Sequence, residues 1–258
     1  MAMYDNKNTV AASFDLNYIS EYLLQAQWAE FIELKKVITE IAERSKRPIT
    51  ILDIGIGNAR IPKHLCGIKD IWEKVAFYDG TDNAMACVDI SNAEIEKLLI
   101  GDKTTAHFFD AANLDTWDKK YDMVITTWFT AGNFHPENFP FDSYKNSDKK
   151  LDLTTNEKFT TIFRNAYNLL NPGGEVVLGA CYLDNEPTRL KQEESYQKMG
   201  MTVITDEADS FTATKEKFWS QRFTKEKIFS YLNFIPEDKF TFTPLDTYEY
   251  AMQVRIKK

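Results

Sequence analysis

The sequence has few cysteines and no long hydrophobic run. Cys66, Cys87 and Cys181 lie far apart and none belongs to a C-x-x-C pair, so neither a metal site nor a disulfide framework is indicated. No apolar run approaches the ~20 residues of a membrane-spanning helix, and the first residues lack the basic and apolar regions of a signal peptide. We therefore expect a cytoplasmic protein without a membrane partner.

An excess of positive charge is also lacking. Lysine and arginine number 31 against 39 aspartates and glutamates, which gives a net charge of −8. A nucleic-acid interface would need a basic patch to neutralise phosphates, so we expect a small-molecule partner and no nucleic acid. The 258 residues are 43% hydrophobic, which suffices for the core of one α/β domain with insertions. The oligomeric state stays open.

Residues 49–60, with the sequence ITILDIGIGNAR, are the most informative stretch. The β-branched run predicts a buried parallel strand, and Gly55 and Gly57 allow a tight turn and a close approach to a ligand. Asp53, at the end of the strand, is expected to face the crevice. A dinucleotide fingerprint, G-x-G-x-x-G, would need glycine where Arg60 stands, so a bound pyrophosphate is disfavoured.

With Ala59, these residues satisfy the pattern (D/E)-x-G-x-G-x-(G/A). The stretch resembles the first motif of the class I S-adenosylmethionine-dependent methyltransferases, and the resemblance extends over about residues 49–256. It implies an α/β fold with a doubly wound, seven-stranded, mostly parallel sheet and an antiparallel C-terminal hairpin. The later matches are residues 86–91, 106–111, 121–127 and 169–178 as strands, 218–226 as the last helix, and 240–256 as the hairpin.

The expected second and third strands of the sheet, residues 86–91 and 106–111, each contain an acid near the end. Asp89 is placed to accept hydrogen bonds from both ribose hydroxyls, although it could instead cap the following helix, and Asp82 is a rival strand end. The resemblance implies that Asp110 binds the adenine amino group and that the Ala111 amide serves the ring nitrogen, whereas Asp110 could also be an ordinary turn residue.

The resemblance therefore implies that S-adenosylmethionine is the cofactor. Its expected binding residues are Tyr22, Asp53, Gly55, Gly57, Asn58, Arg60, Asp89, Ile90, Asp110, Ala111 and Thr127.

Residues 13–44 form a long amphipathic stretch before the first strand, with apolar residues at helical spacing and Pro48 ending it. We expect two helices. The second would pack on the sheet, and the first, with Tyr18, Tyr22 and Trp28, resembles the family's lid over the cofactor. The alternative is that these aromatic residues only pack on the body of the domain.

The segment after the fourth strand, residues 128–153, is the expected substrate insert. It combines aromatic residues, amides and a histidine at the edge of the sheet where open α/β folds bind ligands. Tyr18, Trp128, Asn133 and His135 are the expected substrate-binding residues. His135 is a candidate general base, although a loop histidine before proline could simply bond to its own turn.

We therefore predict a methyltransferase that moves the sulfonium methyl to nitrogen or oxygen of a small molecule by in-line displacement. A regulatory protein that binds the cofactor without turnover is one alternative. An aminopropyl transferase is another, but such enzymes usually carry paired acids where this chain has Thr126 and Thr127. We expect one domain over 1–258: a helical lid (1–47), a cofactor core (49–182) containing the insert, and a C-terminal part (183–258) that completes the sheet.

Overall fold

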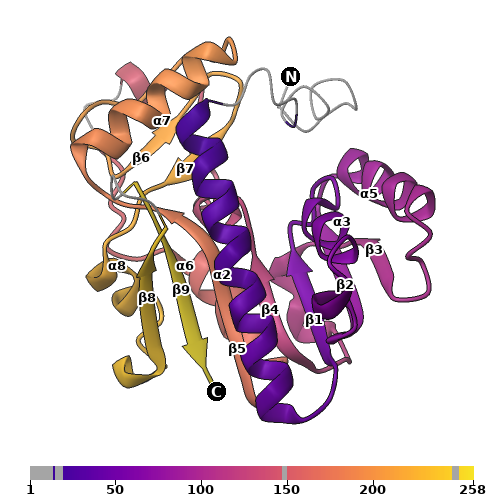
Figure 1. The fold of residues 1–258 in the computed structure, drawn as a ribbon. Helices are drawn as coiled ribbons and strands as arrows, with labels where there is room; N and C mark the ends of the chain where they lie inside the picture. Colours follow the sequence, from indigo (N-terminus) through magenta and orange to yellow (C-terminus); the bar gives the residue numbers. More distant parts are fainter. Residues whose placement is uncertain (1–13, 15–19, 147–149, 246–249) are drawn as a thin grey trace.

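The computed structural model describes residues 14, 20–146, 150–245 and 250–258. A seven-stranded sheet with the order β3-β2-β1-β4-β5-β9-β8 forms its centre (Figure 1). The parallel strands are β1 (Ile49–Ile54), β2 (Val75–Asp82), β3 (Thr104–Phe108), β4 (Tyr121–Thr126) and β5 (Leu170–Tyr182), and the antiparallel strands are β8 (Phe240–Pro244) and β9 (Ala251–Lys257). The predicted doubly wound sheet and its closing hairpin are confirmed.

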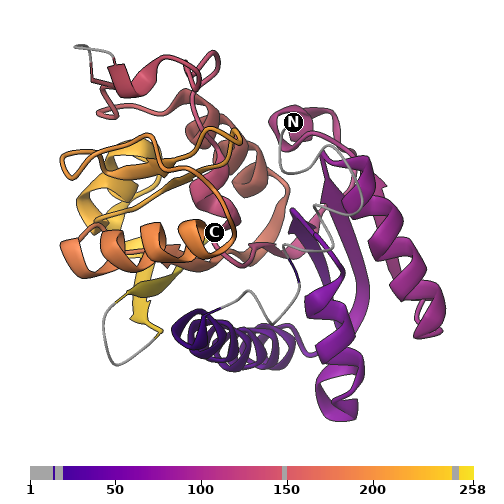
Figure 2. The same cartoon turned by 90° about the horizontal axis from the view of Figure 1, so that it is seen from above.

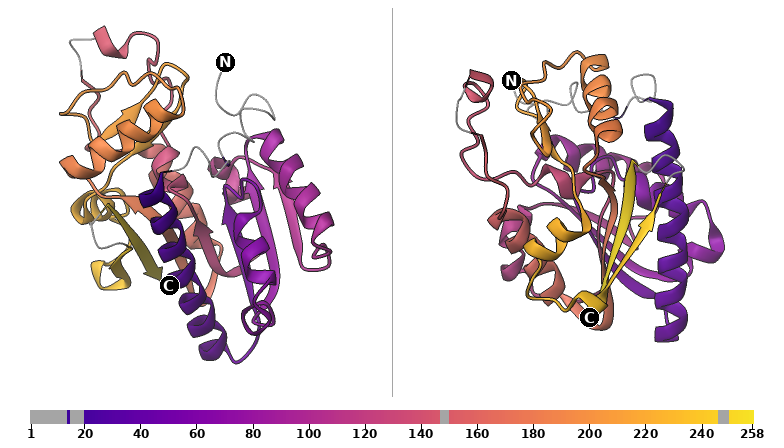
Figure 3. Two further views of the ribbon diagram at one scale, coloured as in Figure 1. Left: turned by 45° about the horizontal axis from the view of Figure 1, so that its top comes forward. Right: turned by 90° about the vertical axis from the view of Figure 1, so that its left-hand side faces the viewer.

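Helices cover both faces of the sheet. They are α2 (Glu21–Ser45), α3 (Arg60–Cys66), α4 (Lys69–Trp72), α5 (Met85–Lys97), α6 (Glu157–Asn168), α7 (Glu186–Lys198) and α8 (Lys225–Tyr231). Figure 3 (right) shows α2 on one side of the sheet and α6 and α8 on the other. Short 3-10 helices are η1 (Ala111–Thr116), η2 (Thr130–Asn133), η3 (Tyr144–Asn146) and η4 (Glu237–Lys239). Among the described residues, no helix is long and apolar enough to cross a membrane.

Alternation along the strands builds a separate core on each face of the sheet. Ile51 of β1 and Met123 of β4 pack with the apolar stripe of α2, while Leu52 and Val124, one position along, pack with α6 and α8. Both strands are buried on both faces, as expected for central parallel strands.

The expected strand over residues 86–91 is wrong, because this segment belongs to helix α5. Cys87, Val88, Ser91 and Ile95 form its buried face. A short apolar run fits a strand or one side of a helix equally well. The second strand is instead β2, which ends at Asp82.

The expected pair of N-terminal helices is also wrong within the described residues, since α2 is one unbroken helix of 25 residues. One face of this helix is buried by apolar residues along its length, among them Leu23, Ala26, Leu34, Val37, Ile38 and Ile41. The spacing that suggested two helices therefore belongs to one. Lys46, with a left-handed φ of 53°, ends the helix before Pro48.

Residues 218–226 do not form the expected last helix. They include β7 (Trp219–Gln221), which pairs with β6 (Phe211–Ala213), and the first turn of α8. Seen from above in Figure 2, this hairpin and α7 lie on one side of the molecule and the β1 to β3 half lies on the other. Phe139 and Tyr144 from the insert pack against the hairpin residues Phe211 and Trp219.

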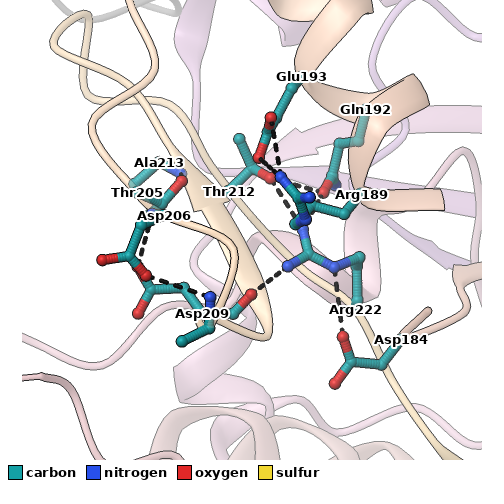
Figure 4. Close-up of polar contacts among 11 residues, drawn as sticks. Asp184, Arg189, Gln192, Glu193, Thr205, Asp206, Asp209, Thr212, Ala213 and Arg222 are labelled. Atoms are coloured by element: carbon teal, nitrogen blue, oxygen red, sulfur yellow. Dashed lines mark hydrogen bonds and ion pairs between the residues drawn. The ribbon is translucent and has the colours of Figure 1, made fainter. Parts of the chain in front are cut away.

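The side chain of Arg222 is buried, with 1% of its surface exposed, and it links this hairpin to α7 and to the residues that follow β5 (Figure 4). Its guanidinium donates hydrogen bonds to Asp184 at 3.3 Å, Gln192 at 2.8 Å and Thr212 at 2.9 Å, and to the backbone carbonyl of Asp209. The β6–β7 hairpin and α7, which lie over the carboxyl ends of β4 and β5, are therefore held together by a buried polar network.

Asp122, at the start of β4, joins the other end of the sheet to the α2–β1 turn. It accepts two hydrogen bonds from Arg47, at 2.7 and 2.8 Å, one from the Thr50 amide at 2.9 Å and one from Asn171 at 2.8 Å. Burial alone would raise the pKa of Asp122, but these donors hold the pKa below its ordinary value. Its contribution to stability is therefore present above the unfolded-state pKa of about 3.9 and is lost as pH falls through the lower native value.

We expect Asp122→Asn to lower the free energy of unfolding by about 1–3 kcal/mol at pH 7, because a charge-assisted cluster loses its acceptor. Urea denaturation from pH 7 to pH 3 measures this loss. The difference in unfolding free energy between the wild type and the variant should become smaller toward pH 3. Asp102→Asn, at an exposed site, is the control. A gap that stays constant with pH would contradict this account.

Candidate active site

A cavity of ≈ 510 Å³ lies at the carboxyl ends of β1, β2 and β4. Small-molecule sites usually measure about 300–1,000 Å³. The strand order reverses between β1 and β4, which is where open α/β sheets bind ligands. The cavity therefore lies where the fold is expected to hold a cofactor.

The glycine turn after β1 forms one wall of the cavity. Gly55 and Gly57 have φ values of 82° and 62°, which disfavour any other residue. A Cβ on Gly55 would lie 2.7 Å from Thr130 Cγ2, and one on Gly57 would lie 3.1 Å from Phe14 Cζ. Both glycines line the cavity, as do Asn58 and Arg60.

Asp82 stands at the end of β2 and lines the cavity. It accepts hydrogen bonds from the Gly57 amide at 3.1 Å and from the Ala84 amide at 2.9 Å, so it braces the glycine turn. Burial raises its pKa, against the effect of these bonds. Asp89 is exposed on α5, and neither Asp89 nor Ile90 lines the cavity. Asp89 was expected to face a ribose because residues 86–91 were expected to form a strand. The structure has helix α5 there instead.

Asp53 is buried behind the cavity wall and does not line it, contrary to the expectation that it faces the crevice. Tyr78 donates a hydrogen bond of 2.6 Å to Asp53 Oδ2, while Oδ1 has no partner among the described residues. Burial raises the pKa of Asp53 to about 7. A cationic group brought close to it would favour the charged carboxylate.

The end of β3 supplies Phe109, Asp110 and Ala111, and all three line the cavity. Asp110 Oδ1 accepts a hydrogen bond of 2.9 Å from the Ala112 amide and so caps η1. Asp110 is therefore a turn residue, which was the alternative left open by the sequence, and it also lines the cavity.

Arg60, the first residue of α3, is connected to two other elements through Glu30 of α2. Arg60 donates a hydrogen bond of 2.5 Å to Glu30, which also accepts one of 2.8 Å from the Trp128 amide. The guanidinium lies 5.6 Å from the Trp128 ring. Glu30 is fully buried, and sequence reasoning missed it, although an acid on the apolar face of an amphipathic helix was a signal for a buried partner.

The N-terminal segment contributes to the cavity through Phe14 and through Leu24, Gln27 and Trp28 of α2. The Trp28 ring lies 5.4 Å from the His64 ring on α3. Tyr18 lies outside the described residues, as does the side chain of Tyr22. Of the three aromatic residues expected in a lid, Trp28 is the one that the described structure places on the cavity wall, and the lid itself stays a prediction.

Thr127, directly after β4, lines the cavity, as do Trp128, Asn133 and His135 of the insert. His135 Nδ1 lies 2.8 Å from the Pro136 carbonyl oxygen. Because a carbonyl only accepts, Nδ1 carries the hydrogen, which leaves Nε2 as the basic nitrogen in the neutral ring. Burial lowers the pKa of His135, and Lys158 lowers it further. The bond to its own turn thus fixes a tautomer that can accept a proton.

Sequence reasoning missed the remaining wall of the cavity. Lys158 and Ile162 come from α6, and Lys217, Phe218 and Trp219 come from the β6–β7 hairpin. Phe218 and Trp219 were not predicted to line the cavity, because residues 218–226 were expected to form a helix. Across the described ranges, no cluster of three or more histidine, cysteine or acidic residues could hold a metal ion.

The sheet order and the glycine turn define the fold of the class I S-adenosylmethionine-dependent methyltransferases. The structure is similar to the CcbJ methyltransferase from Streptomyces caelestis, with a TM-score of 0.60, 11% identity, and coverage of 98% of this chain and 97% of that chain. It is also similar to an S-adenosylmethionine-dependent methyltransferase from Clostridium acetobutylicum ATCC 824, with a TM-score of 0.55, 13% identity and 90% coverage of each chain.

A third similar structure is the magnesium protoporphyrin IX methyltransferase ChlM from Synechocystis PCC 6803 with bound S-adenosylhomocysteine. Its TM-score is 0.53 at 11% identity, with coverage of 93% of this chain and 88% of that chain. No protein-family model and no curated protein sequence matches this chain. At these identities the likeness establishes the fold.

Proposed function

We propose that this chain is a methyltransferase that uses S-adenosylmethionine to methylate nitrogen or oxygen of a small molecule. The observation that carries the proposal is the cavity at the β1/β4 reversal, walled by the glycine turn, Asp82 and Asp110. The similar structures support it, since one contains bound S-adenosylhomocysteine. When bound, the cofactor supplies an electrophilic methyl group on a sulfonium.

The residues present fit this cofactor. The bare glycine turn leaves room for an adenosyl group to approach the backbone. Asp82 would accept hydrogen bonds from the ribose hydroxyls, and Asp110 and the Ala111 amide would bind the adenine. Arg60, which lines the cavity, suits the cofactor's carboxylate. Trp28 and Phe14 would limit the access of water.

The chain's contribution to rate is chiefly alignment. Holding the acceptor in line with the methyl carbon and sulfur is worth up to ~7–11 kcal/mol. If the acceptor is a hydroxyl, it must lose a proton, and Nε2 of His135 is the group on the cavity wall that can take it. Nε2 of His135 would hold the acceptor's proton while the acceptor oxygen takes up the methyl group that S-adenosylmethionine supplies, with S-adenosylhomocysteine as the second product.

Calorimetry with S-adenosylhomocysteine tests the cofactor assignment. We expect Asp82→Ala to weaken binding by about 1–3 kcal/mol, because ribose hydrogen bonds are lost, and Asp89→Ala to leave binding unchanged. Thermal melting of both variants separates lost contacts from a loosened glycine turn. If Asp89→Ala weakened binding and Asp82→Ala did not, Asp89 would be the residue that binds the ribose.

Methyl transfer from methyl-labelled S-adenosylmethionine to pooled metabolites tests the activity. Transfer to a small molecule supports the proposal. Tight binding of S-adenosylhomocysteine with no transfer to any pool would instead favour a regulatory cofactor-binding protein.

A further inference from the structure

Charge is divided unevenly along the cavity wall. The acids on the wall are Asp82 and Asp110, which both lie at the ends of the β2 and β3 strands in the proposed cofactor half. The wall formed after β4 carries Lys158 and Lys217 and, within the described residues, no acid. In a chain with a net charge of −8, a locally cationic wall is the opposite of what composition alone would produce.

Among the described residues, these two lysines lack the carboxylate partners that Arg60 and Lys63 of the same cavity have. Arg60 is paired with Glu30 at 2.5 Å, and Lys63 is paired with Glu94 at 2.8 Å. In the described parts of the chain, neither Lys158 nor Lys217 has an acid within ion-pair distance. Two ammonium groups are therefore available to a ligand in the cavity.

Local structure does not account for either position. Lys158 lies in the first turn of α6, where the helix dipole disfavours a positive charge. Lys217 has a left-handed φ of 63° at the turn of the β6–β7 hairpin, a conformation that favours glycine or asparagine. Neither lysine therefore stabilises the element on which it lies.

The same side of the cavity also carries apolar and aromatic side chains. Ile162, Phe134, Phe218 and Trp219 line this part of the cavity. Trp219 is 2% exposed, and its Nε1 donor has no partner among the described residues. An aromatic ring that carries a hydrogen-bond acceptor would fit such a wall.

We infer that the methyl acceptor is a small aromatic acid whose carboxylate is bound by Lys158 and Lys217 and whose nucleophilic group faces His135. The inference rests on the proposed methyltransferase function, because it takes the β4 side of the cavity as the acceptor site. Charge-assisted hydrogen bonds to a carboxylate are stronger than those to a neutral amide. An acid should therefore bind better than its carboxamide of the same shape.

Matched pairs of ligands test the inference. The probes are the three hydroxybenzoates and the corresponding hydroxybenzamides, titrated by ligand-observed NMR into protein saturated with S-adenosylhomocysteine. We expect at least one hydroxybenzoate to bind about tenfold more tightly than its amide. Added salt should reduce this difference, because it screens the ammonium groups.

Substitutions assign the preference to the two lysines. Lys158→Gln and Lys217→Gln should each weaken hydroxybenzoate binding roughly tenfold and leave hydroxybenzamide binding unchanged. Lys215→Gln is the matched control, since Lys215 is exposed on the same hairpin and does not line the cavity. An equal loss in Lys215→Gln would contradict the inference.

The outcomes separate the two proposals. If S-adenosylhomocysteine binds but no hydroxybenzoate binds better than its amide, the inference on the acceptor is overturned and the proposed function stands. If S-adenosylhomocysteine itself does not bind, both are overturned.

Discussion

His135→Gln is expected to lower the turnover of a hydroxyl acceptor by roughly 100-fold or more, which is the usual contribution of a positioned general base. The Nδ1–H bond to the Pro136 carbonyl leaves Nε2 as the proton acceptor, and His135 lies on the cavity wall. Glutamine keeps a similar size but has no basic nitrogen. The affinity for S-adenosylhomocysteine should not change, because His135 belongs to the substrate side.

The pH profile gives this prediction a second measurement. Because burial lowers the pKa of His135 below its ordinary value of about 6.5, the ring is neutral, and so able to act as a base, at neutral pH. In the wild type, kcat/KM should rise as pH increases through the lowered pKa and then level off. In His135→Gln this rise should be absent.

A matched histidine provides the control. His107 on β3 bonds to Thr105 and does not line the cavity, so His107→Gln should retain both turnover and the pH profile. Unaltered turnover and an unaltered profile in His135→Gln would remove it as a base and would favour a nitrogen acceptor that is already neutral.

Arg222→Met is expected to lower the free energy of unfolding by about 3–5 kcal/mol, the usual cost of removing one partner of a buried charged network. The substitution leaves the Asp184 carboxylate, the Gln192 amide and the Asp209 carbonyl without their shared donor (Figure 4). Urea denaturation at pH 7 measures the loss.

Arg189→Met is the matched control, since within the described structure the Arg189 guanidinium on α7 pairs only with Glu193, one helical turn away. Such pairs contribute about 0.3–0.5 kcal/mol, so this variant should unfold almost as the wild type does. Equal losses in the two variants would mean that the Arg222 network is not what holds the hairpin. A loosened hairpin should also raise KM, because the hairpin carries Lys217 and Trp219.

The cofactor half of the fold was predictable because its signals are local. The ITILDI strand and the following glycines have conformational requirements that can be read from residue types alone. The end of the second strand was not predictable in this way. Residues 77–82 and 86–91 both join an apolar run to an acid, and only packing decides that the first is β2 and the second is part of α5.

The acceptor half could be predicted only in part, because its wall is assembled from distant segments. The aromatic insert pointed to Trp128, Asn133 and His135, all of which line the cavity. Lys158 and Trp219 reach the same wall from α6 and from a short hairpin. Strands of three residues such as β6 and β7 leave little periodicity to detect.

The division of the cavity wall along the sequence has a consequence for how such proteins diversify. Residues 54–127 supply the glycine turn and the strand-end acids, whereas residues 128–219 supply the lysines, His135 and the aromatic wall. Under the proposed function, substitutions within the later block would change the acceptor and leave the cofactor-binding residues unaltered. Chimeras joined after Thr127 would test this consequence directly.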